Sequence, residues 1–168
     1  QFAQARALYM YMYAHTGKQL NFMGNEFGQL REWHEFREQD WDMLKYPMHD
    51  AFHQMMKDLN HLYLTHDAFW KYDYQEKGFE WIDCHQEDKT IYVFKRMSDE
   101  ETIVCFFNFS NKDQIYTYKG EEKTLTLLLD SNNEKYNGTD EDVVIEYEVD
   151  GETEVSLPAY TAMYFIAK

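Results

Sequence analysis

Residues Leu20 to Trp33 read L-N-F-M-G-N-E-F-G-Q-L-R-E-W. The run begins as four mostly apolar residues, which is long enough for a buried strand and too short for a buried helix. Gly24 ends the run, the polar pair Asn25 and Glu26 follows, and Gly28 interrupts the chain again. Helical patterns lie on both sides. The order helix, buried strand, polar loop, helix predicts one unit of a parallel α/β sheet.

Two amphipathic segments flank this stretch. Phe2 to Ala14 carries aromatic and aliphatic residues at a spacing near 3.6, and Gly17 suits a left-handed stop after its end. Met48 to Tyr63 has one apolar stripe with charged residues opposite, and Pro47 stands at its start. The sequence therefore predicts two helices that enclose the strand Leu20 to Met23.

In parallel sheets ligands bind at the carboxyl ends of the strands. Asn25, Glu26 and the loop out to Trp33 follow the predicted strand, so they are the candidate site residues. The loop continues to about Trp41 and mixes carboxylates, arginines and indoles, a combination that suits a carbohydrate. A second interpretation stays open: Trp33 and Trp41 simply close the base of the loop against the next helix.

From about residue 73 the pattern changes to short strands with polar turns. We expect an α+β chain, with a helix–strand–helix part over residues 1–72 and an antiparallel all-β sandwich over residues 73–168. The apolar run Thr102 to Phe109 predicts a central strand, and Asp150-Gly151 predicts a two-residue hairpin. The other expected strands are Phe79 to Cys84, Thr90 to Lys95, Gln114 to Tyr118, Thr124 to Leu129, Val143 to Val149, Glu152 to Leu157 and Tyr160 to Ile166.

Charge and composition exclude several classes of partner. The formal net charge is −15, and between Glu121 and Glu154 twelve acidic residues face two lysines, a surface that repels nucleic acids and anionic membranes. No run approaches 18 apolar residues, so no membrane span is expected. The chain opens on Gln1 inside a helical pattern, without a leader segment, which indicates a piece of a longer protein.

The residues that usually hold metals or form disulfides give no such pattern. Cys84 and Cys105 lie in predicted strands, where a buried thiol is expected, and they favour a cytoplasmic, reducing compartment. One disulfide between the two stays open as an alternative. His49, Asp50 and His53 partly match a zinc-protease helix, but aspartate replaces the general-base glutamate and no third ligand is evident. We expect no metal and no cofactor.

Five collinear motifs resemble 1,4-α-glucan branching enzymes, members of the α-amylase superfamily of glycoside hydrolases and transglycosylases. The motifs are F-M-G-N-E-F-G-Q-L-R-E-W at Phe22 to Trp33, D-W-D-M-L at Asp40 to Leu44, D-L-N-H-L-Y at Asp58 to Tyr63, G-F-E-W at Gly78 to Trp81 and N-F-S at Asn108 to Ser110. The first 80 or so residues match this family closely and the remainder more loosely.

The resemblance implies that residues 1–72 are the last helix, strand and helix of a (β/α)8 barrel and that the family's C-terminal β-domain follows. In that family the nucleophilic aspartate, the acid glutamate and a third aspartate lie on strands four, five and seven, all before Gln1. No catalytic residue is therefore assigned here, and the chain alone should be inactive. Asn25, Glu26, Glu32 and Trp33 are the implied contacts to the substrate.

The implied partners are an α-glucan such as glycogen or amylose and the missing N-terminal part of the same protein. A lone parallel strand without neighbours is unstable, so Leu20 to Met23 is expected either to fray or to be covered, with the helices folding onto each other, onto the sandwich or onto a second copy. Two other functions stay open: another α-amylase superfamily enzyme, or a carbohydrate-binding β-sandwich module. The module's aromatic platform would consist of Trp81, Tyr92, Tyr116 and Tyr118.

Overall fold

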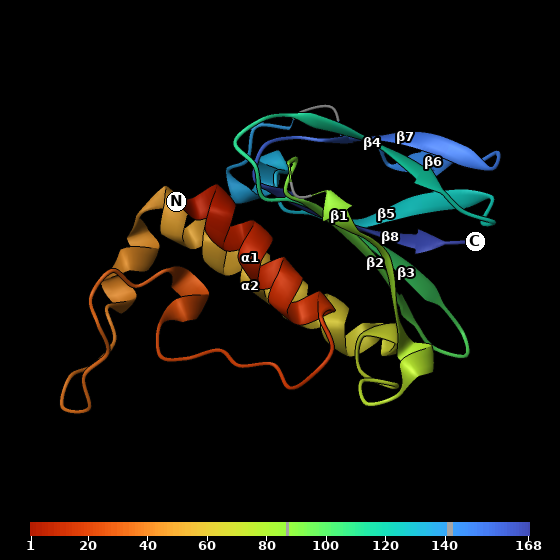
Figure 1. Ribbon diagram of the computed structural model, residues 1–168. Coiled ribbons are helices and arrows are strands. Elements are labelled where there is room, and N and C mark those ends of the chain that lie inside the picture. The colour runs from red at the N-terminus through yellow and green to blue at the C-terminus, as the bar shows by residue number, and fades with distance from the viewer. Residues whose placement is uncertain (87, 141–142) are drawn as a thin grey trace.

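A computed structural model describes residues 1–86, 88–140 and 143–168 as three layers (Figure 1). Two long helices form the first layer, a six-stranded antiparallel sheet the second, and a two-stranded sheet the third. The helices are α1 (Phe2–Ala14) and α2 (Pro47–Thr65), with short 3-10 turns η1 (Asn25–Phe27), η2 (Trp41–Lys45), η3 (Asp67–Phe69), η4 (Glu76–Gly78) and η5 (Glu134–Tyr136). The strands are β1 (Phe79–Gln86), β2 (Ile91–Met97), β3 (Thr102–Asn108), β4 (Gln114–Lys119), β5 (Thr124–Asp130), β6 (Glu146–Glu148), β7 (Glu152–Leu157) and β8 (Thr161–Ala167).

The six-stranded sheet, in the order β1-β2-β3-β8-β5-β6, is buried on both faces at its centre. On β3, Ile103, Cys105 and Phe107 belong to the core shared with the helices. The alternate residues Val104 and Phe106 belong to the core beneath β4 and β7. A strand covered on both sides must be apolar at every position. The continuous apolar run of β3 is therefore explained, and its predicted central place is confirmed.

The small sheet pairs β4 with β7 and completes the sandwich. The hairpin predicted at Asp150-Gly151 is wrong, because β6 pairs with β5 in the large sheet whereas β7 pairs with β4 in the small one. Val149 enters the core between the two sheets, and Gly151, at φ 75°, takes the chain from one sheet to the other. The change of layer is a tertiary event that the local Asp-Gly signal does not encode.

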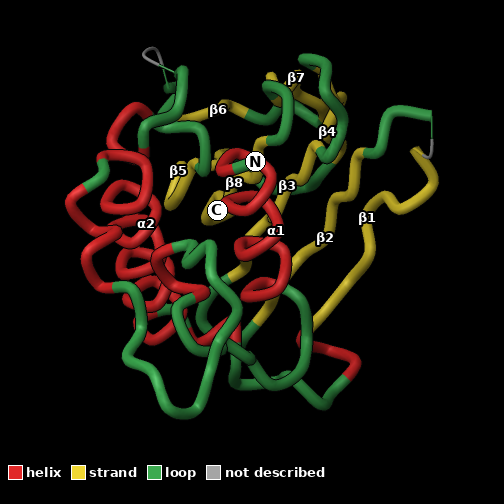
Figure 2. Tube along the Cα trace, turned by 90° about the vertical axis from the view of Figure 1, so that its left-hand side faces the viewer, coloured by secondary structure: helices red, strands yellow, loops and turns green. Residues whose placement is uncertain are grey.

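The two helices have the predicted positions, and α1 has the predicted bounds. They run side by side in the same direction over one face of the large sheet (Figures 1 and 2). Pro47 occupies the first turn of α2, where its missing N–H costs nothing. Ring contacts join the helices, with the centroid of Phe52 lying 5.8 Å from that of Phe2 and 5.7 Å from that of Tyr9. None of the described helices has the length and apolar content needed to cross a bilayer.

The strand predicted at Leu20 to Met23 is not formed. The chain returns from the end of α1 toward the start of α2 along this segment, but the segment has no strand partner within the described residues (Figure 1). Leu20 is 70% exposed and Phe22 49% exposed. A parallel strand needs neighbours for its hydrogen bonds and covers for its faces. The exposed segment is the fraying that the sequence led us to expect.

Arg96 on β2 joins the helical layer to the sheet. Its side chain is fully buried and donates to the carbonyl oxygens of Ala14 (2.6 Å), Phe69 (2.7 Å) and Gly78 (3.2 Å). It also forms an ion pair with Asp73, at 2.5 Å between the nitrogen and the carboxylate oxygen. One guanidinium thus donates hydrogen bonds to a carbonyl at the end of α1 and to one carbonyl in each of the turns η3 and η4 that lead into β1.

A second buried connection lies at the other end of α1. Arg6 donates to the carbonyl oxygens of Ser131 (2.5 Å) and Tyr136 (3.2 Å), and the hydroxyl of Tyr164 on β8 donates to the carbonyl of Met10. Because the helices and the sheet share a core and these bonds, they form one folded body. The division of the chain near residue 72 stays a prediction.

Asp130, at the end of β5, is an exception to this satisfied network. It is 2% exposed, its Oδ1 accepts from the backbone N–H of Asn132 at 2.8 Å, and its Oδ2 has no hydrogen-bond partner among the described residues. Burial raises the pKa of Asp130 to about 6, against the opposing effect of the hydrogen bond from the Asn132 backbone and a smaller opposing effect of the Arg6 charge. The charged form is therefore disfavoured in the folded protein.

We expect Arg96→Ala to lower the free energy of unfolding by about 3–5 kcal/mol, because it leaves a buried carboxylate and three carbonyls without their donor. Urea denaturation followed by circular dichroism measures the change. Lys119→Ala is the matched control, since the Lys119–Glu152 pair spans 3.6 Å on exposed side chains and its loss should change stability by no more than about 0.5 kcal/mol. Equal effects of the two substitutions would contradict the role of Arg96.

Asp130→Asn should remove a pH dependence of stability. Because the folded pKa lies above the unfolded one, the native state binds the extra proton, and this group's stabilising contribution is complete below pH 4 and is lost as the pH rises through 6. A difference of about two pKa units corresponds to about 3 kcal/mol. Urea midpoints of the two proteins between pH 4 and 7.5 should converge at low pH and diverge, with the variant more stable, at high pH. Parallel curves would refute this.

Candidate functional site

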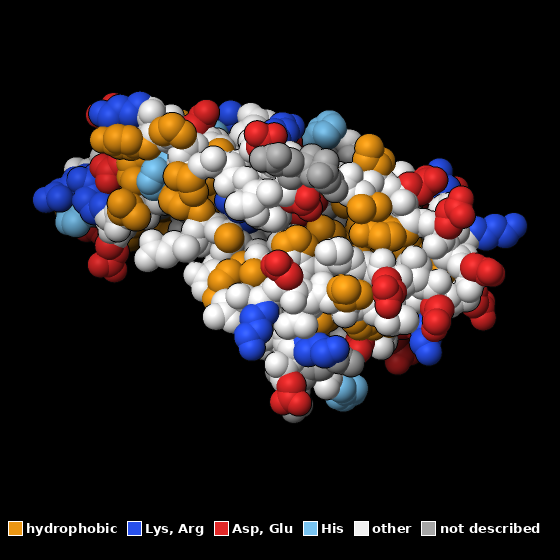
Figure 3. Space-filling view, turned by 90° about the horizontal axis from the view of Figure 1, so that it is seen from above, with side chains coloured by type: hydrophobic (Ala, Val, Ile, Leu, Met, Phe, Trp, Pro, Cys, Tyr) orange, Lys and Arg blue, Asp and Glu red, His pale blue; other side chains and the backbone are white. Residues whose placement is uncertain are grey.

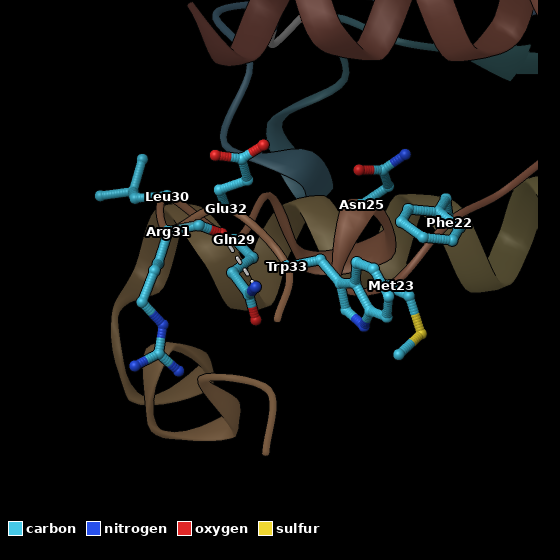
Figure 4. A pocket seen from close by; sticks show the side chains of 8 residues that line it. All are labelled: Phe22, Met23, Asn25, Gln29, Leu30, Arg31, Glu32 and Trp33. Atoms are coloured by element: carbon cyan, nitrogen blue, oxygen red, sulfur yellow. Dashed lines mark hydrogen bonds between the residues drawn. The ribbon is translucent and has the colours of Figure 1, made fainter. Parts of the chain in front are cut away.

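A hollow of about 450 Å³ lies in the loop between α1 and α2 (Figure 4). Its walls consist of aromatic and aliphatic side chains together with an amide, a carboxylate and a guanidinium. The lining residues are Phe22, Met23, Asn25, Gln29, Leu30, Arg31, Glu32 and Trp33. The hollow thus falls on the stretch that the sequence singled out.

Two glycines shape the backbone around the hollow. Gly24 has φ 88° and Gly28 has φ 66°, in the left-handed region that other residues avoid, and they bound the single turn η1. A Cβ atom at Gly24 would lie 2.8 Å from the Cβ of Gln29, so glycine also allows the close approach of that side chain. The turn therefore explains the two glycines of the G-N-E-F-G pattern.

Two of the three histidines of α2 hold this turn from behind. The Nδ1 nitrogen of His49 donates to the carbonyl of Phe27 (2.8 Å), and that of His53 donates to the carbonyl of Glu26 (3.2 Å). These bonds occupy one ring nitrogen of each. Within the described residues no three or more His, Cys, Asp or Glu side chains are grouped to hold a metal ion. The histidines spaced four apart position η1.

The base of the loop is clamped by three polar side chains. Gln29 accepts from the backbone N–H of Asp40 (2.8 Å) and donates to the carbonyl of Arg31 (2.9 Å). Arg31 forms an ion pair with Asp40 at 2.6 Å and donates to the carbonyl of Glu38 at 3.1 Å. The clamp brings the two ends of the loop together and keeps Trp33 at the edge of the hollow. This clamp could not be predicted from the sequence, because nothing in the order of the residues pairs the Gln29 side chain with a backbone N–H eleven positions away.

The structure brings three of the four predicted contact residues together. Asn25, Glu32 and Trp33 line the hollow, whereas Glu26 does not. Glu26 lies near Tyr9 of α1 instead. Burial raises the pKa of Tyr9, and the carboxylate of Glu26 adds a smaller effect in the same direction.

The two indoles of the loop differ in their surroundings. The ring of Trp33 meets that of Phe22 edge to face, at 5.4 Å between centroids, and is 40% exposed at the hollow. The ring of Trp41 lies 4.9 Å from that of Phe27 and closes the loop against the turn η1. Trp41 is itself 45% exposed, so each indole has one packing contact and one exposed part, and the packing role stays a prediction for both residues.

This arrangement suits binding rather than acid–base chemistry. Retaining glycosyl transfer requires two carboxyl groups about 5–5.5 Å apart. Of the eight side chains that line the hollow, Glu32 alone carries a carboxylate. An aromatic face beside an amide, a carboxylate and a guanidinium can pack on an apolar ring face and hydrogen-bond hydroxyl groups.

Comparison with known proteins identifies the family. Residues 81–168 match the alpha amylase C-terminal all-beta domain. The chain belongs to this family. The matched residues contain β2 to β8 and most of β1, so the sandwich seen in the structure is the domain that the family describes.

The sequence is also similar to named bacterial enzymes. It is 44% identical over 110 residues to the 1,4-alpha-glucan branching enzyme GlgB of Nitrosococcus oceani, which covers 66% of this chain and 15% of that protein. It is 34% identical over 143 residues to GlgB of Bacillus cereus, covering 83% of this chain and 22% of that protein. The chain thus corresponds to less than a quarter of the length of these relatives.

Solved structures share the whole fold. A structure of AmyP in complex with maltose matches with a TM-score of 0.70 and 14% identity, covering 98% of this chain and 34% of AmyP. An alpha-amylase of Anoxybacillus matches with a TM-score of 0.63 and 21% identity, covering 98% of this chain and 32% of that protein. The match includes the helices and the loop as well as the sandwich, and so supports the arrangement of all three layers.

We expect Gln29→Ala to loosen the clamp. Loss of one hydrogen bond should speed exchange of the Asp40 amide hydrogen by about tenfold, because the N–H loses its acceptor. Hydrogen–deuterium exchange with NMR detection measures this. Gln4→Ala, on the exposed face of α1, is the control and should leave the Asp40 amide unchanged. Unchanged exchange in both variants would show that the clamp does not hold the loop.

Proposed function

We propose that this chain is the C-terminal part of a 1,4-α-glucan branching enzyme, which forms α-1,6 branches in glycogen by retaining glucan transfer. The observation that carries the proposal is the 34% identity to GlgB over 143 residues, which extends beyond the β-domain into the helical part. In this proposal α1 and α2 are the last outer helices of the barrel, and residues 20–23 form its eighth strand once the neighbouring strands are present.

The chemistry of the reaction supports a second part of the proposal. One carboxylate attacks the anomeric carbon, a carboxylic acid protonates the leaving oxygen, and a 6-hydroxyl of another glucan segment then accepts the chain. The hollow offers a single carboxylate, from Glu32. We therefore propose that the chain has no branching activity by itself and that the reacting acids come from the N-terminal part.

In the complete enzyme the hollow would form one wall of the sugar site. We propose that Trp33 packs on a glucose ring while Asn25 and Glu32 accept or donate hydrogen bonds at its hydroxyls. Glu26, which lies outside the hollow, would reach the glucan only where the sugar chain continues past it. Apolar side chains gather at the end of the molecule that carries the loop (Figure 3). The exposed apolar residues of this loop, among them Leu20 and Phe36, would be covered by the N-terminal part or, in the isolated chain, by a second copy.

The alternative of a carbohydrate-binding module has less support. Tyr118 is fully buried, Tyr116 is 9% exposed, and both belong to the core of the sandwich. Tyr92 packs against the other core, so only Trp81, at 39% exposure, remains of the expected platform.

Another α-amylase superfamily activity is the remaining alternative, and product analysis separates it from branching. A cytoplasmic location is part of the proposal, in keeping with the bacterial relatives.

The test compares the 168-residue chain with the full gene product on amylose, with α-1,6 linkages counted by proton NMR. We expect branching by the full product and none by the chain alone. Trp33→Ala in the full product should lower kcat/KM by about tenfold or more, because a buried indole face is lost from the sugar site.

Tyr74→Ala is the matched control, at an exposed aromatic residue outside the loop. Tyr74 is 76% exposed and does not line the hollow, so its loss should leave kcat/KM within twofold of the parent. Branching by the isolated chain would overturn the proposed inactivity. Hydrolysis without new α-1,6 linkages in the full product would overturn the branching assignment. Equal effects of the two substitutions on kcat/KM would show that Trp33 does not contact the glucan.

A further inference from the structure

A groove distant from the loop runs between α2 and β5, which lie side by side (Figure 2). It consists of two adjoining hollows of about 380 Å³ and 160 Å³ that share Leu128, Leu129, Lys135 and Tyr136 in their walls. The larger hollow alone falls in the size range of small-molecule sites. None of its lining residues belongs to the hollow at Trp33.

The floor of the groove is aliphatic and is built by an irregular strand. The pairing of β5 with β8 shifts register between Leu127 and Leu129, so Leu128 is an extra residue in the strand. Bulges of this kind redirect a side chain, and here both Leu128 and Leu129 line the groove. Leu62 of α2 completes the floor.

The rim is polar and close to neutral. Asp58 of α2 accepts from Lys135 at 2.6 Å and from the hydroxyl of Tyr136 at 2.7 Å, which fixes the helix against η5. These bonds, with the lysine charge, lower the pKa of Asp58 against the opposing effect of its burial. The ion pair cancels the two charges, while His61 and His66 bring imidazole groups to the same rim.

The inner end of the groove holds a buried acceptor. Asp130 lines the smaller hollow, and its Oδ2 is the carboxylate oxygen without a hydrogen-bond partner in the described part of the chain. Arg6, whose charge acts on Asp130, directs its hydrogen bonds to the carbonyls of Ser131 and Tyr136 instead. A buried oxygen of this kind gains most from a ligand that brings a hydroxyl or amide donor.

We propose that this groove is a second carbohydrate-binding site, separate from the hollow at Trp33, and that it takes a neutral oligosaccharide. The aliphatic floor matches the C–H faces of sugar rings, and the rim and Asp130 match their hydroxyl groups. The Asp58–Lys135 ion pair leaves no net charge on the rim to attract an ionic ligand, and the carboxyl group of Asp130 disfavours an anion. The choice of an α-linked glucan as the ligand rests on the proposed function; the hydroxyl chemistry of the groove does not.

The test is a titration of the ¹⁵N-labelled 168-residue chain with maltoheptaose, followed by amide chemical shifts. Saturable shifts are expected in residues 61–66 and 127–136. Thr65→Arg places a long side chain over the larger hollow, and Leu128→Ala removes part of the floor. Each should raise the dissociation constant for these shifts at least fivefold. Thr117→Arg, an exposed threonine on β4, is the matched control and should leave the constant unchanged.

Absence of shifts in residues 61–66 and 127–136 at millimolar maltoheptaose would overturn the second site, as would binding that Thr65→Arg and Leu128→Ala leave intact. Equal binding of cellohexaose would overturn the choice of an α-linked ligand. The outcome is independent of the branching assay: a chain that binds maltoheptaose in the groove while the full product fails to branch amylose would refute the proposed function and leave the groove assigned.

Discussion

The guanidinium of Arg96 is buried where α1, the turns η3 and η4 and strand β2 meet, and it satisfies three carbonyls and one carboxylate there. A buried charge is tolerated only with such a complete set of partners. Because its acceptors come from parts of the chain as distant as Ala14 and Gly78, the cation can be buried only when the helices lie on the sheet. This single side chain thus makes the helical layer and the β-layer depend on each other.

Much of the fold could be predicted from the sequence, because its main signals lie in consecutive residues. A strand buried on both faces must be apolar throughout, which the run at β3 shows, and a helix start with Pro47 is a local signal. The apolar stripes of α1 and α2 allowed both helices to be located, because the face that packs on the core must be apolar. These features are recorded in consecutive residues, so composition and spacing alone suffice to find them.

The features that escaped prediction depend on distant parts of the chain. Leu20 to Met23 has the composition of a strand, but a strand exists only with a partner, and the described residues supply none. Gly151 has the form of a hairpin turn, yet it carries the chain between two sheets. The clamp of Gln29 on Asp40 and the bulge at Leu128 are likewise set by contacts that no local pattern contains. The candidate loop could therefore be located, but its internal geometry could not.

The position of the hollow follows from how α2 is held. One face of α2 packs into the core with the sheet, while His49 and His53 on the same helix bond the carbonyls of the turn η1. The sheet therefore fixes the helix, the helix fixes the turn, and the turn and its two glycines set the wall that carries Asn25. The β-domain is therefore connected to the wall of the hollow through this sequence of contacts. In the proposed branching enzyme, this connection would give a physical reason to keep a sandwich packed against the last two helices of the barrel.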